Sequence, residues 1–194
     1  MPDARPLLQI HIGSTRPGRI GPAFAAWFAD VATRHDCFDV EVVDLAEVGL
    51  PLLDEPNHPR LRQYVHQHTK DWSATVDRAD AFVIVTPEYN YGYSAATKNA
   101  LDYLCHEWGD KAVGFVSYGG VGAGTRAVQQ LKQVVTTLRM VPVLESVNIP
   151  FAMQKLTAEG EAITDAGLEE AAKVMLDELA RMSAKLRPTG TSDN

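Results

Sequence analysis

Short apolar runs alternate along the chain with amphipathic stretches. Runs rich in apolar residues and bounded by turn residues predict buried strands at residues 7–12, 40–45, 81–86, 112–118 and 141–144. Apolar residues recur at helical spacing over residues 21–33, 61–78, 96–106, 125–138 and 166–186. Predicted strands therefore alternate with predicted helices, which is the pattern of an α/β protein.

This alternation also constrains the sheet. Crossovers between parallel strands are right-handed in almost all proteins, so the pattern predicts a doubly wound, five-stranded parallel sheet with helices on both faces. Ligands of such sheets bind beyond the carboxyl ends of the strands. We therefore expect a binding site in the loops after the first, third and fourth predicted strands.

The length of 194 residues favours one domain, because a chain of this size can bury a single sizeable core. We expect that domain at residues 1–187, followed by a frayed polar tail at residues 188–194. No apolar stretch is long enough to span a bilayer, and no signal peptide is readable. The two cysteines, Cys37 and Cys105, form no CxxC pair or disulfide framework, which favours a cytoplasmic protein.

Charge narrows the class of partner. The chain carries 18 Lys and Arg against 25 Asp and Glu, a formal net charge of -7 at pH 7. A protein with this charge is repelled by a polyphosphate backbone and by anionic lipid, so we expect neither nucleic acid nor a membrane as partner. A small-molecule ligand is the better interpretation.

The loop after the first predicted strand, residues 13–21, is suited to an anion. It places hydroxyls, the guanidinium of Arg16 and free N–H groups at the positive end of the next helix. Its glycine spacing matches the start of a Walker A loop, but Arg19 and Ile20 stand where Lys and Ser/Thr would hold a nucleoside triphosphate. A single phosphate monoester, as in FMN, fits better. The alternative is a Gly/Pro-rich turn with a solvated arginine.

The other two loops favour a flat aromatic ligand. Residues 86–93 contain three tyrosines, together with Glu88 and Asn90. The tyrosine rings can stack on a flavin, and Asn90 and backbone groups can read the edge of its pyrimidine. The alternative for this loop is a turn that packs on a partner subunit. Residues 117–124 are rich in glycine, so their backbone can approach a ring closely, although a flexible turn would look the same. Thr125 breaks a GxGxxG pattern, so a Rossmann fingerprint is absent.

Histidines and cysteines elsewhere give no metal or nucleophile site. His66 and His68 are two apart on a predicted helix and are expected to point away from each other. His11 lies within the first strand, where a hydrogen-bonded histidine is the simpler interpretation. Cys105 and His106 end a predicted helix with no third group to complete a catalytic arrangement.

Four motifs occur in the order found in a known family. Residues 13–19, 87–90, 98–102 and 117–120 resemble those of the NADPH-dependent FMN reductases, which include quinone, chromate and azo-dye reducing members. The similarity extends to about residue 187. It implies a flavodoxin-like fold with strand order 2-1-3-4-5, bound FMN, NADPH or NADH as electron donor, and a homodimer or dimer of dimers.

The resemblance also implies which residues bind FMN. Those expected at its phosphate are Ser14, Arg16, Arg19, Ile20 and Gly21. Those expected around its isoalloxazine are Pro87, Glu88, Tyr89, Asn90, Ser117, Tyr118, Gly119 and Gly120. Many relatives carry Ser or Asn at the position of Ile20 or Gly21, so phosphate binding here shifts toward backbone N–H groups.

The expected activity is hydride transfer from the nicotinamide to FMN and onward, by a ping-pong route, to a small acceptor. Free flavin, a quinone, an azo compound and a metal oxyanion are the acceptor classes that the resemblance allows. Because FMN carries the hydride chemistry, no side chain is predicted to act as a catalytic acid or base. The alternatives are a non-enzymatic FMN electron carrier and a redox-sensing flavoprotein. Arg16 and the modest net charge favour the enzyme.

Overall fold

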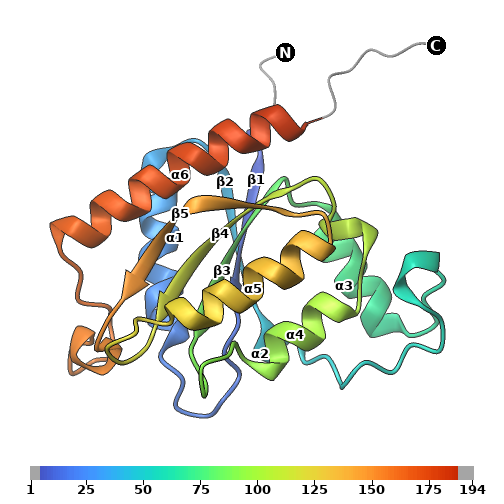
Figure 1. Ribbon diagram of the computed structural model, residues 1–194, viewed down its shortest axis with the longest axis horizontal. Helices are drawn as coiled ribbons and strands as arrows, with labels where there is room; N and C mark the ends of the chain where they lie inside the picture. The colour runs from blue at the N-terminus through green and yellow to red at the C-terminus, as the bar shows by residue number, and fades with distance from the viewer. Residues whose placement is uncertain (1–4, 188–194) are drawn as a thin grey trace.

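A computed structural model describes residues 5–187. Its strands are β1 (Leu7–Ile12), β2 (Asp39–Asp44), β3 (Ala81–Pro87), β4 (Ala112–Tyr118) and β5 (Val141–Ile149). They form one sheet in the order β2-β1-β3-β4-β5, with every neighbouring pair parallel (Figure 1). The predicted flavodoxin-like, doubly wound sheet is confirmed. The predicted tail at residues 188–194 lies outside the described residues, and the single domain over residues 1–187 stays a prediction.

Helices cover both faces of the sheet. The α-helices are α1 (Gly21–His35), α2 (Leu45–Val48), α3 (Gln67–Asp77), α4 (Ala95–Asp102), α5 (Thr125–Thr137) and α6 (Ala166–Leu186). Short 3-10 helices are η1 (Pro59–Leu61), η2 (His106–Trp108) and η3 (Ala152–Lys155). One core lies under α1 and α6, and a second lies under α3, α4 and α5. Within the described residues, no helix has the length and apolar character needed to cross a membrane.

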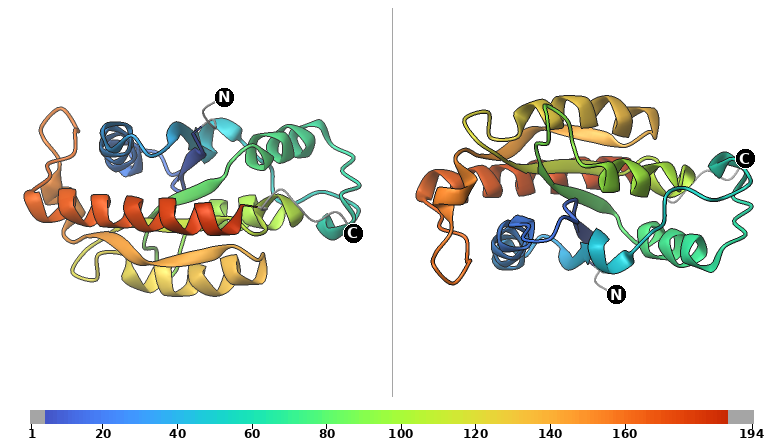
Figure 2. Two further views of the ribbon diagram at one scale, coloured as in Figure 1. Left: turned by 90° about the horizontal axis from the view of Figure 1, so that it is seen from above. Right: turned by 90° about the horizontal axis from the view of Figure 1, so that it is seen from below.

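Burial explains why the central strands are so apolar. Every residue of β3 and of β4 is buried, because helices pack on both faces of these strands. β2 and β5 lie at the sheet edges and keep exposed positions. Figure 2 places the loop after β5, in orange, at one end of the molecule and the segment between α2 and α3, in cyan, at the other.

The helix predicted at residues 61–78 begins only at Gln67, so the predicted start of this helix was wrong. Arg62 has a φ of 51°, which ends η1 and is incompatible with a continuing helix. The Glu55 carboxylate accepts hydrogen bonds from the backbone N–H groups of Val65 and His66 at 2.8 and 3.0 Å. These contacts hold the segment extended, and tertiary structure thus overrides local periodicity.

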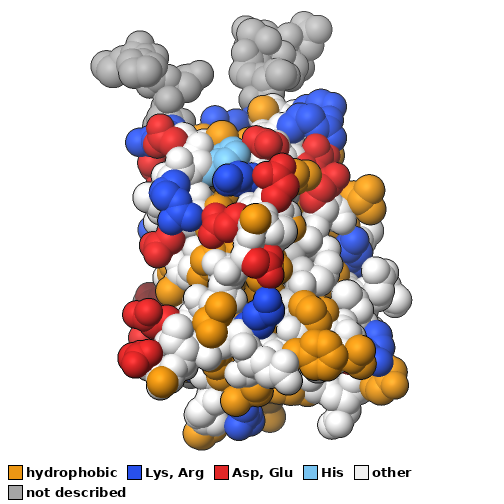
Figure 3. All heavy atoms as spheres, turned by 90° about the vertical axis from the view of Figure 1, so that its left-hand side faces the viewer, with side chains coloured by type: hydrophobic (Ala, Val, Ile, Leu, Met, Phe, Trp, Pro, Cys, Tyr) orange, Lys and Arg blue, Asp and Glu red, His pale blue; other side chains and the backbone are white. Residues whose placement is uncertain are grey.

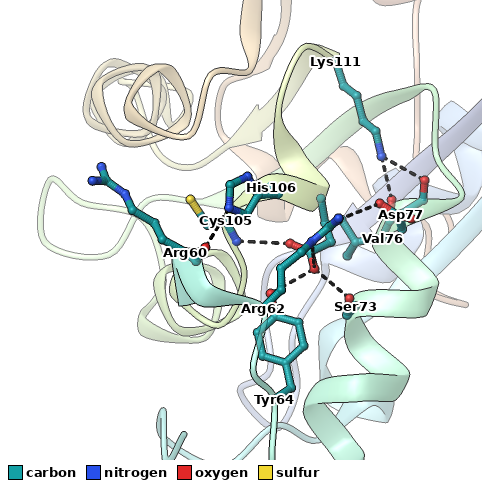
Figure 4. A network of polar contacts seen from close by, with 10 residues as sticks. Arg60, Arg62, Tyr64, Ser73, Val76, Asp77, Cys105, His106 and Lys111 are labelled. Atoms are coloured by element: carbon teal, nitrogen blue, oxygen red, sulfur yellow. Dashed lines mark hydrogen bonds and ion pairs between the residues drawn. The ribbon is translucent and has the colours of Figure 1, made fainter. Parts of the chain in front are cut away.

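A buried carboxylate anchors the same segment (Figure 4). Glu107 is 1% exposed and accepts hydrogen bonds from Tyr64 Oη at 2.9 Å and Ser73 Oγ at 2.7 Å. Arg62 Nε adds a contact at 3.3 Å. Burial alone would raise the pKa of Glu107, but Ser73, Tyr64 and the Arg62 charge together lower it. Glu107 therefore ties the segment before α3 to α3 and η2 as an ionised group.

The expected orientation of two histidines is also wrong. The rings of His66 and His68 stack with centroids 5.2 Å apart and planes 9° from parallel. His66 precedes α3 with an extended backbone, so the spacing rule for helical side chains does not apply to it. Within residues 5–187, no group of three or more His, Cys, Asp and Glu side chains is arranged to hold a metal ion.

Two further element ends differ from the prediction. The helix predicted at residues 96–106 ends at Asp102, and Cys105 has a non-helical backbone. β5 runs from Val141 to Ile149, although the strand was predicted to stop at residue 144. The second half of β5 contains polar residues, which suit a strand at the edge of a sheet because solvent lies where a central strand has a second neighbouring strand. The longer strand carries the following loop to the edge of the sheet where β3 and β4 end.

His11 on β1 is a core residue, 4% exposed, with its Nε2 3.1 Å from Gln9 Oε1. The rings of Trp72, Phe82 and Trp108 surround it at centroid distances of 5.4 to 5.9 Å. Burial lowers the pKa of His11 to about 3. The folded protein therefore holds this imidazole neutral under conditions in which the unfolded chain protonates it.

We expect His11 to make the folded protein less stable as the pH falls. Its pKa is lower in the folded than in the unfolded state, so the free energy of unfolding decreases as pH falls from about 6.5 toward 3, by at most about 1.4 kcal/mol per pH unit. Denaturant titrations from pH 7 to pH 4 should show a shallower slope for His11→Gln. Equal slopes for the wild-type protein and His11→Gln would contradict this assignment.

Candidate functional site

The loops after β1, β3, β4 and β5 meet in one pocket at the carboxyl edge of the sheet. The pocket has a volume of about 360 Å³ and more apolar than polar lining. Its lining residues are Arg16, Arg19, Ile20, Pro87, Glu88, Tyr89, Tyr118, Gly119, Gly120, Phe151, Ala152, Met153 and Gln154. In Figure 3, hydrophobic side chains gather toward the lower end of the molecule, which is the end to which the arrows of β4 and β5 point in Figure 1.

An ion pair shapes the loop after β1. Arg19 Nη2 donates to Asp44 Oδ2 at 2.6 Å, and Arg19 Nη1 donates to the carbonyl oxygen of Ser14 at 2.7 Å. Burial alone would raise the pKa of Asp44, but hydrogen bonds from Arg19 and from the Ala46 N–H lower it. The Arg19 side chain is therefore committed to joining this loop to the end of β2.

Arg16 differs from Arg19 because its charge has no carboxylate partner among the described residues. The side chain is exposed on the pocket rim, and its Nη1 donates only to the carbonyl oxygen of Pro17 at 3.1 Å. The backbone N–H groups of Ser14, Thr15 and Arg16 donate to no described residue. This loop therefore offers one free cation and several free donors.

A buried polar atom without a partner lies beside these donors. Ser14 is 1% exposed, and its Oγ makes no hydrogen bond with any described residue. A Cβ on Gly21 would lie 2.5 Å from this Oγ and 2.7 Å from the Tyr118 hydroxyl, so only glycine leaves both groups in place. Burial raises the pKa of Tyr118 to about 12, although the neighbouring Ser14 hydroxyl lowers it.

The first turn of α1 completes the cradle formed by Ser14, Gly21 and Tyr118. It has neither a side-chain cap nor an acidic residue, so the Gly21 N–H and the positive dipole end are free to meet an anion, whereas Pro22 has no N–H and the Ala23 N–H donates to the Ile20 carbonyl oxygen. A phosphate monoester requires many donors and little space, which is what these groups supply. The residues present therefore fit the phosphate of FMN.

The loop after β3 contains a tight turn. The N–H and carbonyl groups of Tyr89 and Gly92 bond reciprocally at 2.8 and 2.9 Å, and Asn90 and Tyr91 between them both have positive φ values, 49° and 71°. This is the geometry of a type I′ turn. Tyr89 lines the pocket, whereas Asn90 lies at the turn and does not.

The loops after β4 and β5 form a single wall. The carbonyl oxygens of Gly119 and Gly120 accept from the N–H groups of Ala152 and Phe151 at 2.9 and 3.1 Å. Ser117 lies beneath this wall, where its Oγ is within hydrogen-bond distance of the Ala123 carbonyl oxygen and of Asn148 Oδ1. The wall carries exposed apolar side chains, with Val121 78%, Phe151 51% and Met153 73% exposed.

Most predicted site residues lie at the pocket. Those that line it are Arg16, Arg19, Ile20, Pro87, Glu88, Tyr89, Tyr118, Gly119 and Gly120. Those that do not are Ser14 and Gly21, which lie behind the first loop, together with Asn90 and Ser117. The residues that follow β5, at positions 151–154, were not predicted from the sequence. The signal that would have found them is the pair of apolar residues at 147 and 149 followed by Pro150, which extends the strand to this edge.

Comparison with known proteins agrees with the geometry. A family model described as NADPH-dependent FMN reductase matches residues 7–154. The chain belongs to this family. It is therefore an oxidoreductase that depends on FMN and a nicotinamide nucleotide, as the resemblance implied.

Individual relatives carry related names. The chain is 42% identical over 149 residues to an NAD(P)H-dependent FMN reductase of Schizosaccharomyces pombe, which covers 75% of this chain and 74% of the relative. It is 30% identical over 130 residues to an FMN-dependent NADPH-azoreductase of Staphylococcus saprophyticus, and this match covers 66% of this chain and 69% of the relative. The flavoenzyme FerB of Paracoccus denitrificans, 19% identical, shares the fold with a TM-score of 0.72 over 93% of this chain and 98% of its own.

Gly21→Ala should weaken FMN binding without unfolding the protein. Its methyl group must push Ser14 Oγ or the Tyr118 hydroxyl aside, and overpacking of about 1–3 kcal/mol corresponds to a roughly 5- to 150-fold rise in Kd. Fluorescence titration with FMN measures the effect. Gly109→Ala is the control, because a Cβ there meets nothing closer than 3.4 Å. Wild-type affinity in Gly21→Ala would contradict the assignment of the cradle.

Proposed function

We propose that this protein oxidises NADPH or NADH at a bound FMN and reduces a small-molecule acceptor in the same pocket by a ping-pong route. When bound, FMN supplies the hydride chemistry. The observation that carries the proposal is the phosphate-sized cradle, with its unpartnered Ser14 Oγ, opening into a largely apolar pocket. Free flavin, a quinone, an azo compound and a metal oxyanion are the proposed acceptor classes, and a relative named as an azoreductase supports the third.

Each wall of the pocket has a proposed role. Ser14, Arg16, Gly21 and the free N–H groups of the first loop bind the phosphate, and Ile20 closes the side of the pocket next to it. Arg19 fixes the loop rather than the ligand, because Asp44 already satisfies its guanidinium.

The remaining loops frame the rings. The segments at residues 87–90 and 117–120 supply backbone donors and flat surface to the isoalloxazine, and Gly119 and Gly120 allow close approach. Phe151 and Met153 border the open side, where a nicotinamide or an acceptor ring would stack. No described side chain is required as a proton donor for hydride transfer, so these residues act by positioning.

The proposal includes assembly and location. We propose a cytoplasmic homodimer or dimer of dimers that binds neither nucleic acid nor membrane. The net charge of -7 and the free thiols of Cys37 and Cys105 support the location and the absence of a nucleic-acid partner. The exposed apolar side chains near the pocket support contact between copies of the chain.

Arg16→Ala should lower the affinity for FMN but not for riboflavin. Loss of a charge-assisted hydrogen bond to the phosphate, about 1.5–3 kcal/mol, corresponds to a roughly 10- to 150-fold rise in Kd. Riboflavin lacks the phosphate, so the ratio of the two affinities isolates this contact from damage to the fold. Arg139→Ala, at an exposed pair with Asp110, is the matched control. An unchanged ratio in Arg16→Ala would show that the phosphate binds elsewhere.

A ping-pong enzyme reacts with its donor before the acceptor binds. Anaerobic mixing of the FMN-loaded protein with NADPH should therefore bleach the visible absorbance of the flavin with no acceptor present. Steady-state double-reciprocal plots against a quinone should be parallel, because donor and acceptor use one open face in turn. Intersecting lines would contradict a shared site. Absence of bleaching with either NADPH or NADH would contradict the proposed function itself.

A further inference from the structure

An ion pair lies behind the wall of the pocket, with a shielded carboxylate and a guanidinium whose side chain is 42% exposed. The Glu88 side chain is 9% exposed and lines the pocket, and Arg126 Nε donates to its Oε1 at 2.6 Å. Arg126 Nη2 also contacts Glu88, and the Arg126 backbone N–H lies 3.3 Å from Oε2. Arg126 comes from the first turn of α5 and does not line the pocket. The carboxylate therefore stands between its cation and the bound ligand.

The surrounding loops are shaped to admit the Arg126 side chain. A Cβ on Gly122 would lie 2.5 Å from Arg126 Nη2, so glycine leaves the path open. The Arg126 guanidinium carbon lies 3.9 Å from the centre of the Tyr91 ring, and Gln130 Nε2 donates to the Tyr91 carbonyl oxygen at 3.1 Å. Helix α5 thus holds both the carboxylate and the strained turn of the loop after β3.

Charge balance at the pocket depends on this pair. The charged residues that line the pocket are Arg16, Arg19 and Glu88. Asp44 neutralises Arg19, and the rim residue Arg16 is exposed to solvent. Hydride transfer adds two electrons and one proton to the flavin, so the ring gains negative charge. An unpaired carboxylate in the wall would repel that charge in surroundings less polar than water.

We propose that Arg126 is a positioning residue that neutralises Glu88 and thereby sets the reduction potential of bound FMN. The proposal rests on the proposed function, because it requires the isoalloxazine to occupy the pocket beside Glu88. Arg126 acts through Glu88 and Tyr91 and does not itself contact the ligand. With the pair intact, the wall adds no net charge, and the protein binds reduced FMN without electrostatic penalty.

Opposite charge changes at the two positions test this role. Arg126→Gln leaves Glu88 unpaired, Glu88→Gln leaves Arg126 unpaired, and the double variant removes both charges. For each protein, the measurements at pH 8 are the Kd values of oxidised and dithionite-reduced FMN and the midpoint potential by equilibration with a reference dye. Wild-type protein is measured first, and failure to bind FMN would reject the proposed function rather than the role of Arg126.

We expect Arg126→Gln to weaken binding of reduced FMN about tenfold more than binding of oxidised FMN, which lowers the two-electron midpoint potential by about 30 mV. Glu88→Gln should raise the potential, and the double variant should return close to the wild-type value. Arg126→Lys, which keeps the charge but loses the planar contact with Tyr91, should keep the potential. Unchanged potentials in both single variants, or shifts of the same sign, would overturn the proposal, since damage to packing does not depend on the sign of the charge.

Discussion

Parallel pairing of the strands is the constraint on which the site depends. In a parallel sheet the carboxyl ends of all strands reach one edge. Loops separated by up to about 140 residues therefore meet there, although no local sequence pattern links one loop to another. The register pairs Thr86 with Ser117 and Tyr118 with Ile149, which brings the loops after β3, β4 and β5 to the same height. The pocket is a consequence of that register, and the side chains refine a cleft that the topology already provides.

Two arginine–carboxylate pairs then divide the pocket's charges. Arg19 with Asp44 fixes the loop after β1, and Arg126 with Glu88 fixes the loops after β3 and β4. In both pairs the carboxylate is the shielded member, because Asp44 and Glu88 are 12% and 9% exposed, whereas the Arg126 side chain is 42% exposed to solvent. What remains unpaired is Arg16, at the end of the pocket where an anionic group is expected. Pairing elsewhere thus concentrates the available positive charge in one place.

The sequence predicted the architecture well and the details of the site unevenly. The central strands are continuous apolar runs, so their positions and the sheet type followed from periodicity. The start of α3 did not, because Glu55 and Glu107 impose an extended backbone through contacts that no local pattern records. The end of β5 was missed because an edge strand lacks the continuous apolar run of a central one. The partner of Arg19 was equally invisible, since Asp44 lies 25 residues away.

Backbone strain at the pocket has a physical reason of its own. Asn90, Tyr91, Ala123 and Phe151 all have positive φ values without being glycine, and all lie in the loops at this edge. Such conformations cost about 1–2 kcal/mol each unless their surroundings hold them. Here the reciprocal bonds of the type I′ turn and the backbone bonds between the loops after β4 and β5 hold them. Donors fixed in this way need no reordering when a flat ligand enters, so the entropy cost of binding falls, and the stability of the core offsets the strain.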